Sequence, residues 1–102
     1  MSRKIITLCG STKFKKEFEE EAKYLTLLGN IVISVNLFGH SDDDEAWDKK
    51  ALLDDIHLDK IRMSDAIFVI NKDGYIGEST SREITYAKSL RKQIMYLEDK
   101  EM

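Results

Sequence analysis

Four short apolar runs, separated by three longer segments of helical periodicity, constrain the fold of this 102-residue chain more than any other feature. The runs cover residues 4–9, 31–35, 66–70 and 93–97, and their apolar and β-branched content is typical of strands covered on both faces. Between them, apolar residues recur at every third or fourth position, which is the spacing of a helix with one buried stripe. The chain therefore alternates strand and helix from end to end.

The first and third predicted helices have recognisable ends. The first begins at about Lys13, after a glycine turn, and ends at Gly29-Asn30, since glycine is common just after a helix. The third begins at Ser79 or Thr80, either of which is a suitable N-cap, and runs to about Leu90.

The second helix is predicted over residues 45–63, and Asp42 and Glu45 before it have the spacing of a capping box. Its apolar positions form two adjacent rows. One face holds Leu52, Ile56 and Met63, and the row beside it holds Leu53, His57 and Ile61. His57 is therefore predicted to lie beside the buried stripe.

Strands that alternate with helices imply parallel pairing with right-handed connections. We expect one α/β domain over residues 1–102: a small three-layer, doubly wound parallel sheet of the Rossmann-like or flavodoxin-like kind, with four strands in the order 2-1-3-4. Ligands of such sheets bind at the carboxyl ends of the strands, beside the point where the strand order reverses. The loops after the first three strands are therefore the places to look for function.

Composition and charge exclude several classes of partner. Sixteen basic against nineteen acidic residues give a net charge of −3, so we expect no nucleic-acid polymer as a partner. No apolar run is long enough to cross a bilayer and residues 1–4 lead into a strand without a signal-peptide core, so we expect a cytoplasmic protein with no membrane partner. Cys9 is the single cysteine, which fits a reducing compartment. No cysteine and histidine grouping has zinc spacing, and we expect no metal or other cofactor.

The turn Gly10-Ser11-Thr12 is the first candidate for chemistry. It places a glycine and two hydroxyls where a strand gives way to a helix, and the free amides of a helix N-terminus attract anions such as phosphate. The alternative is ordinary capping, since serine is a common N-cap. The turn is not a Walker loop, because the second glycine and the Lys-Ser/Thr pair are missing.

The segment between the third strand and the third helix is the second candidate. It contains Tyr75, Gly77, Ser79, Thr80, Ser81 and Glu83. Thr80-x-x-Glu83 has the spacing of a capping box, in which the glutamate merely accepts the N-cap amide hydrogen. Alternatively, a carboxylate in the first turn of this helix faces the ligand crevice, and the helix dipole keeps it ionised and nucleophilic.

The third candidate is His57 together with Asp59, near the end of the second helix. Histidine titrates near neutral pH and can move protons in catalysis. The alternative is a packed, hydrogen-bonded histidine, with Asp54, Asp55 and Asp59 forming a solvated face. Tyr75 likewise has two interpretations, as a packing residue or as a cover for a ligand ring.

Several segments resemble those of the nucleoside 2-deoxyribosyltransferases and the related 2'-deoxynucleoside 5'-phosphate N-hydrolases. They are Leu8-Cys9-Gly10-Ser11, Ser64-Asp65, and Thr80-x-x-Glu83-Ile84-x-Tyr86-Ala87 followed by Lys92-Gln93-Ile94. The resemblance implies that Glu83 is a nucleophile, forming an ester with the deoxyribose C1' while the base leaves. His57 stands where that family has an acidic residue, eight positions before Asp65.

The resemblance also implies a small nucleoside or nucleotide as the partner. Glu83 would act at the sugar, and His57 or Asp59 would give a proton to the base. The residues expected to bind substrate are Gly10, Ser11, Tyr75, Gly77, Ser79, Thr80 and Ser81, with the serines and helix amides holding a 5'-phosphate. A homodimer or larger assembly is expected, with Trp47 and Leu58 in the contact.

Two other functions stay open on the sequence. One is a non-catalytic nucleotide-binding module, in which Glu83 caps its helix or hydrogen-bonds a ribose. The other is an N-ribohydrolase resembling the cytokinin-activating phosphoribohydrolases, whose Cys-Gly-Ser turn and Gly-Thr-x-x-Glu segment are similar. Release of free base from deoxynucleoside monophosphates separates the enzyme from the binding module.

Overall fold

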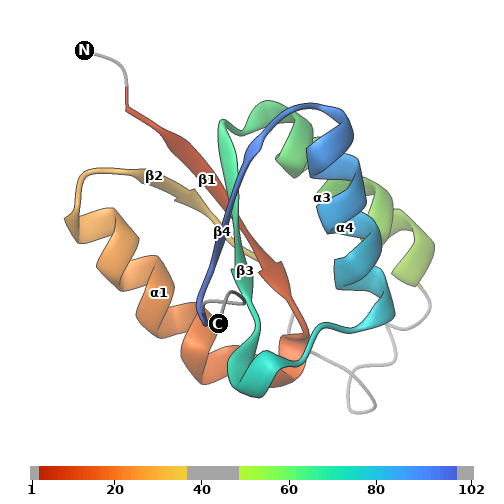
Figure 1. The fold of residues 1–102 in the computed structure, drawn as a ribbon, viewed down its shortest axis with the longest axis horizontal. Coiled ribbons are helices and arrows are strands. Elements are labelled where there is room, and N and C mark those ends of the chain that lie inside the picture. The colour runs from red at the N-terminus through yellow and green to blue at the C-terminus, as the bar shows by residue number, and fades with distance from the viewer. Residues whose placement is uncertain (1–2, 37–48, 99–102) are drawn as a thin grey trace.

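The computed structural model of the chain describes residues 3–36 and 49–98 (Figure 1). The strands are β1 (Ile5–Gly10), β2 (Ile31–Ile33), β3 (Ala66–Ile70) and β4 (Gln93–Tyr96), and the α-helices are α1 (Lys15–Leu27), α3 (Lys50–Met63) and α4 (Glu78–Ser89). Short 3-10 turns cover Thr12–Phe14 and Lys72–Gly74. None of the helices in these ranges is long and apolar enough to cross a membrane.

The four strands form one parallel sheet in the order β2-β1-β3-β4. β1 and β3 pair most extensively, from Ile6 opposite Ala66 to Gly10 opposite Ile70. The α/β class, the parallel pairing and the strand order 2-1-3-4 are therefore confirmed. Because the strand order reverses beside β1, the carboxyl ends of β1 and β3 flank the crevice where ligands of such sheets bind.

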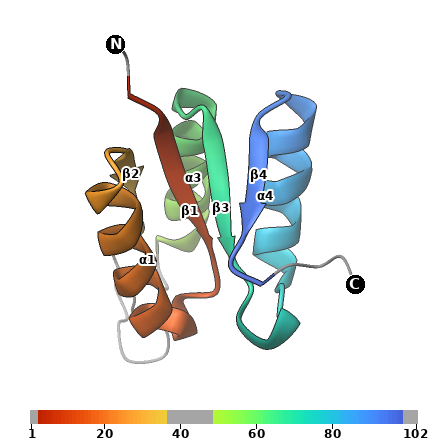
Figure 2. The same ribbon diagram turned by 60° about the vertical axis from the view of Figure 1, so that its left-hand side comes forward.

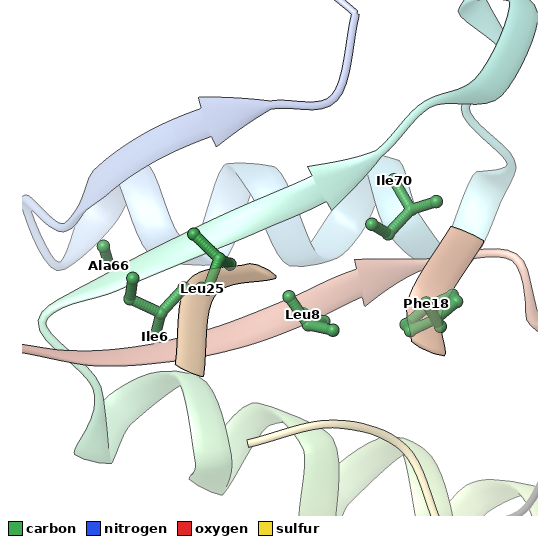
Figure 3. Close-up of a cluster of buried hydrophobic side chains, with 6 residues drawn as sticks. All are labelled: Ile6, Leu8, Phe18, Leu25, Ala66 and Ile70. Carbon is green, nitrogen blue, oxygen red and sulfur yellow. The ribbon is translucent and has the colours of Figure 1, made fainter. Parts of the chain in front are cut away.

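Helix α1 covers one face of this sheet (Figure 2). The side chains of a strand point alternately to opposite faces, so β1 contributes every second residue to this layer. Ile6 and Leu8 pack there against Phe18 and Leu25 of α1, as Figure 3 shows. The cluster is apolar throughout, which is the ordinary composition of a core.

Helices α3 and α4 cover the opposite face. Cys9, one position after Leu8, points to this side and packs with Ile61 of α3 and with Ile84 and Ala87 of α4. The two clusters together make the three layers predicted from the sequence. The layer formed by α3 and α4 also contains buried polar side chains, some of which belong to the candidate site described below.

The ends of several elements differ from the prediction, by one residue at β1 and β4 and by more elsewhere. β2 ends at Ile33 and not at Val35, and the carbonyl of the next residue, Ser34, accepts a hydrogen bond from the Lys60 ammonium at 2.9 Å. The first helix opens with the 3-10 turn and becomes α-helical only at Lys15. Helix α4 begins at Glu78 with Gly77 as its N-cap, two residues before Ser79, the earlier of the two predicted caps.

The predicted buried face of the second helix was wrong. Leu52, Ile56 and Met63 are 52%, 39% and 60% exposed, whereas His57 and Ile61 of the adjacent row are buried. Helix α3 meets β1 through that row: Cys9 packs with Ile61, and the Thr7 hydroxyl donates a hydrogen bond to the Lys60 carbonyl. The predicted start of this helix, its cap at Asp42 and the side chain of Trp47 lie outside the described residues.

Candidate active site

A cleft of about 530 Å³ lies at the carboxyl ends of β1 and β3. Its walls come from the turn after β1, the residues after β2, the loop after β3 and the facing sides of α3 and α4. Of the predicted site residues, those that line it are Gly10, Ser11, His57, Tyr75, Gly77, Ser79, Thr80 and Glu83. A cleft of this size can hold a small molecule of nucleotide dimensions.

The floor of the cleft depends on Gly10. A Cβ at this position would lie 2.9 Å from the carbonyl oxygen of Ile70, so only glycine allows the ends of β1 and β3 to approach this closely. Ser11 follows, and its hydroxyl accepts a hydrogen bond from the Lys13 amide at 3.3 Å. The capping interpretation of Ser11 is thus confirmed, and the same residue also lines the cleft.

Three reactive side chains from three different elements meet at the inner end of the cleft. The Cys9 sulfur lies 3.4 Å from Nε2 of His57, and Nε2 lies 3.8 Å from Oε1 of Glu83. The three donor atoms lie within 4.8 Å of one another. Cys9 and His57 are buried, and the Glu83 side chain is 15% exposed.

Local structure explains why these three side chains meet. Cys9 is the last residue of β1 before Gly10 and points to the α3 and α4 side. His57 lies one turn before Ile61 on the buried row of α3, and Glu83 adjoins Ile84 on the inner side of α4. Each of the three side chains therefore lies next to a buried apolar residue, and the packing of that residue holds the helix or strand in position.

The capping-box interpretation of Thr80 and Glu83 was wrong. Helix α4 begins at Glu78 with Gly77 as N-cap, and no side chain caps it. Thr80 is consequently inside the helix and buried, and Glu83 lies in the second turn, where its carboxylate points toward His57. The glutamate is therefore released from helix capping and faces the cleft.

Burial governs the ionisation of this group. Desolvation raises the pKa of Glu83 to about 7, with a further rise from the charge of Asp54, against opposing effects of the Cys9 hydrogen bond and of Arg82 and Lys50. Desolvation, followed by the Glu83 charge, raises the pKa of the Cys9 thiol well above its ordinary value, so the thiol remains protonated.

His57 shifts in the opposite direction. Burial and then the charge of Lys60 lower its pKa to about 4, although Asp54 and a hydrogen bond to the Leu8 backbone oppose this. The imidazole is therefore neutral near pH 7, and its contact with Glu83 is not a full ion pair there. The expectation that the helix dipole keeps Glu83 ionised was wrong, because burial raises the pKa of this carboxyl to about 7.

Sequence reasoning missed the charged residues of α3 that line the cleft. Lys60 reaches across to the Ser34 carbonyl, and burial lowers the pKa of its ammonium. Lys50 pairs with Asp54 at 3.1 Å, one helical turn apart. The four-residue spacing of Lys50 and Asp54 and the position of Lys60 one turn after His57 were visible signals, but they became informative only once the His57 row proved to be the buried one.

Tyr75 lies at the mouth of the cleft. The Lys13 ammonium sits 3.7 Å from the centroid of its ring, and the Phe14 ring meets it edge to face with centroids 6.0 Å apart. A Cβ on Gly77 would come within 3.1 Å of the Tyr75 hydroxyl, so the glycine lets the phenol fold over the loop. Tyr75 remains 45% exposed despite these two contacts.

The remaining predicted residues divide between the cleft and its surroundings. Ser79 lines the cleft and accepts a hydrogen bond from Arg82 at 3.3 Å. Ser81 lies instead on a second cavity, also of about 530 Å³, between α3 and α4. Asp59 is on the exposed face of α3, paired with Arg62 at 3.0 Å and 62% exposed, so the structure does not bring it to the cleft.

No protein-family profile matches this chain, and no curated protein matches its sequence. Assignment of a function therefore depends on the residues of the cleft and their chemistry. A carboxylate and an imidazole in contact, beside a thiol and beneath a rim of hydroxyls and lysines, can perform nucleophilic attack at carbon, transfer a proton, or ligate a metal ion.

Proposed function

We propose that this protein cleaves or exchanges the base of a deoxynucleoside or deoxynucleoside 5'-monophosphate, with Glu83 as the nucleophile. The observation that carries the proposal is the position of the Glu83 carboxylate, which makes no cap and faces the cleft beside His57. The resemblance of residues 80–87 to the deoxyribosyltransferase signature supports the same role.

The proposed reaction has two steps. An oxygen of the ionised Glu83 carboxylate forms an ester bond with C1' while the C1'–N bond breaks and the base leaves with the electron pair. Water or a second base then attacks C1' and releases the carboxylate. Positive charge develops on the sugar in both steps, and a poorly solvated carboxylate stabilises it more strongly than one in bulk water.

The departing base needs a proton, and His57 is assigned that transfer because its Nε2 lies 3.8 Å from Glu83. The reactive state has Glu83 ionised and the proton on His57. The pKa values of about 7 and about 4 make this a minority state of the pair, so turnover is expected to be slow. Asp59 has no part in this proposal, since it pairs with Arg62 away from the cleft.

A 5'-phosphate is the proposed anchor of the substrate. Ser11 and Ser79 line the cleft at the starts of the 3-10 turn and of α4, where backbone amides and hydroxyls favour an anion. The Lys60 ammonium adds a positive charge on the opposite wall. Tyr75 at the mouth is the residue proposed to cover the base.

A homodimer or larger assembly remains part of the proposal. Leu58, predicted in a subunit contact, packs inward against the α3 and α4 core. The subunit contact is instead proposed at the exposed apolar row of Leu52, Ile56 and Met63. Ile56 also lines the cleft. Light scattering at micromolar concentration tests this, and a particle of 11.8 kDa would contradict it.

The decisive experiment is to incubate the pure protein with each deoxynucleoside monophosphate and measure free base by chromatography. Wild type is expected to release base, and Glu83→Gln, which keeps shape but cannot form the ester, is expected to release none. Asp59→Asn is the matched control and should keep full turnover, while circular dichroism verifies that both variants fold.

Other results would change the assignment. Ligand binding without base release by wild type would favour the non-catalytic module. Release from ribonucleotides alone would favour the phosphoribohydrolase alternative. Wild-type turnover by Glu83→Gln would remove Glu83 from the mechanism.

A further inference from the structure

The group formed by Cys9, His57 and Glu83 contains three different kinds of metal-ligand atom. A thiol sulfur, an imidazole nitrogen and a carboxylate oxygen converge from β1, α3 and α4, all within 4.8 Å of one another. Sulfur and imidazole ligands favour zinc-like ions over magnesium or calcium, which prefer oxygen alone. The three ligand atoms are therefore close together, and their chemical types favour a zinc-like ion.

Two of the three separations are close to those of ligands around one tetrahedral ion, and the third, between the Cys9 sulfur and the Glu83 carboxylate, is within 4.8 Å. Zinc lies about 2.3 Å from sulfur and about 2.0–2.2 Å from nitrogen or oxygen, so tetrahedral ligands are roughly 3.4–3.6 Å apart. The sulfur of Cys9 is 3.4 Å from Nε2 of His57, and Nε2 is 3.8 Å from Oε1 of Glu83. A carboxylate movement of a few tenths of an ångström closes the second distance.

Access, orientation and charge also suit an ion at this point. His57 and Glu83 line the cleft, so an ion can enter from it, and its fourth position faces the cleft. The His57 ring is held by a hydrogen bond to the Leu8 backbone, the kind of outer contact that orients metal ligands. On binding, the metal–sulfur bond replaces the S–H bond of Cys9, and the thiol proton, with any proton on Glu83, is released to solvent. The resulting thiolate and carboxylate balance the charge of a divalent cation, and within residues 3–36 and 49–98 no lysine or arginine forms an ion pair with Glu83.

We propose that Cys9, His57 and Glu83 form a binding site for a zinc-class divalent ion with its fourth position open to the cleft. This inference does not depend on the proposed function. An ion bound here would be coordinated by the Glu83 carboxylate that is proposed to attack C1' and by Nε2 of His57, so neither group could take part in the reaction. Bound Zn²⁺ is therefore expected to inhibit base release, and binding and turnover are alternative states of one site.

Cobalt(II) added to chelator-treated protein tests the site directly, because a tetrahedral cobalt thiolate has a charge-transfer band in the near ultraviolet. We expect one equivalent to bind with this band, and Zn²⁺ to displace it. Cys9→Ser should lose the band. Glu83→Gln and His57→Gln should bind Zn²⁺ more than about 100-fold more weakly, since even outer contacts of a site are worth 10–100-fold. Asp59→Asn is the control and should bind as wild type does.

Absence of cobalt binding at micromolar protein would overturn the proposal, and so would an unchanged spectrum in Cys9→Ser. If circular dichroism shows that Cys9→Ser does not fold, the two glutamine variants test the proposal instead. Wild-type affinity for Zn²⁺ in both of them would contradict the proposed metal site. These measurements need no substrate. Failure of metal binding therefore leaves the base-release assay unaffected, and an inactive protein can still bind the ion.

Discussion

The buried residues of α1 are both apolar, Phe18 and Leu25, whereas the layer beneath α3 and α4 buries four polar side chains as well as Cys9. The polar ones are Thr7, His57, Ser64 and Thr80. Both layers take residues from β1, which sends Ile6 and Leu8 to one side and Thr7 and Cys9 to the other. One strand thus supplies stability on one face and chemistry on the other.

Hydrogen bonds also connect the elements of the polar layer beneath α3 and α4. The Thr7 hydroxyl donates to the Lys60 carbonyl at 3.2 Å and contacts the Ser64 hydroxyl, fixing the end of α3 to β1. His57 lies one turn earlier on the same helix and is held in place by this anchor. The comparison indicates that buried polar contacts on this face position the site, while α1 only supports the fold.

The largest expected effect is on stability at the α1 face. Phe18→Ala removes a fully buried ring and is expected to lower the free energy of unfolding by about 3–5 kcal/mol. Urea denaturation measures this loss, and Leu27→Ala, at an exposed position of the same helix, should change it by less than about 0.5 kcal/mol. Base release per folded molecule should stay unchanged, because no residue of α1 lines the cleft. A matching loss of turnover in folded Phe18→Ala would break the separation of the two faces.

The second prediction concerns pH and the polar face. The pKa of Glu83 rises from 4.5 unfolded to about 7 folded, so the folded state is stabilised by protonation at low pH and loses that stabilisation as pH rises through about 7. Glu83→Gln has no group that titrates at this position, so its free energy of unfolding should not fall in this way as pH rises. The difference in unfolding free energy, variant minus wild type, should therefore increase on the order of 3 kcal/mol between pH 4.5 and pH 7.5.

Urea denaturation at several pH values, with a chelator present, measures that difference. His57 has the opposite sign, since its depressed pKa stabilises the folded state above about 6.5 and that stabilisation is lost as pH falls toward about 4. Comparing the variant with wild type at each pH largely cancels it. A pH-independent difference would show that Glu83 is solvated like an ordinary surface glutamate.

The smallest effect expected is at the rim of the cleft. Ser11→Ala and Ser79→Ala should each weaken binding of a deoxynucleoside monophosphate by about 1.5–3 kcal/mol, the value of one hydrogen bond to a charged group. Ser81→Ala is the control, since this serine, unlike Ser11 and Ser79, does not line the cleft. Calorimetry with nucleotide and nucleoside sharpens the test: equal affinity for the two would remove the phosphate from the proposed substrate.

Much of the fold could be predicted from the periodicity of apolar residues. The apolar run at residues 66–70 became β3 with the same bounds, and Gly29-Asn30 follows the end of α1 as predicted. Helix α3 was less predictable, because two adjacent apolar rows satisfy the same helical pattern. The row holding Leu52 and Met63 looked more apolar than the one holding His57, and only packing against β1 selected the latter.

The site was predictable in its residues and less so in its arrangement. The turn at Gly10 and the segment around Glu83 follow strands whose carboxyl ends meet, which the strand order implied. Whether Glu83 caps its helix depends on where α4 begins, and the N-cap at Gly77 lies two or three residues before the predicted caps, Ser79 and Thr80. Such a shift moves a carboxylate from the first turn to the second and changes its partner.

The sequence by itself determined the parallel sheet, the strand order and the end of the sheet that holds the cleft, because alternation and periodicity are local properties of the chain. Tertiary structure alone decided that Cys9, His57 and Glu83 meet, since they are separated by long stretches of sequence and no spacing rule connects them. It also decided their protonation: burial raises the pKa of Glu83 and lowers that of His57, and burial exists only once three layers have packed.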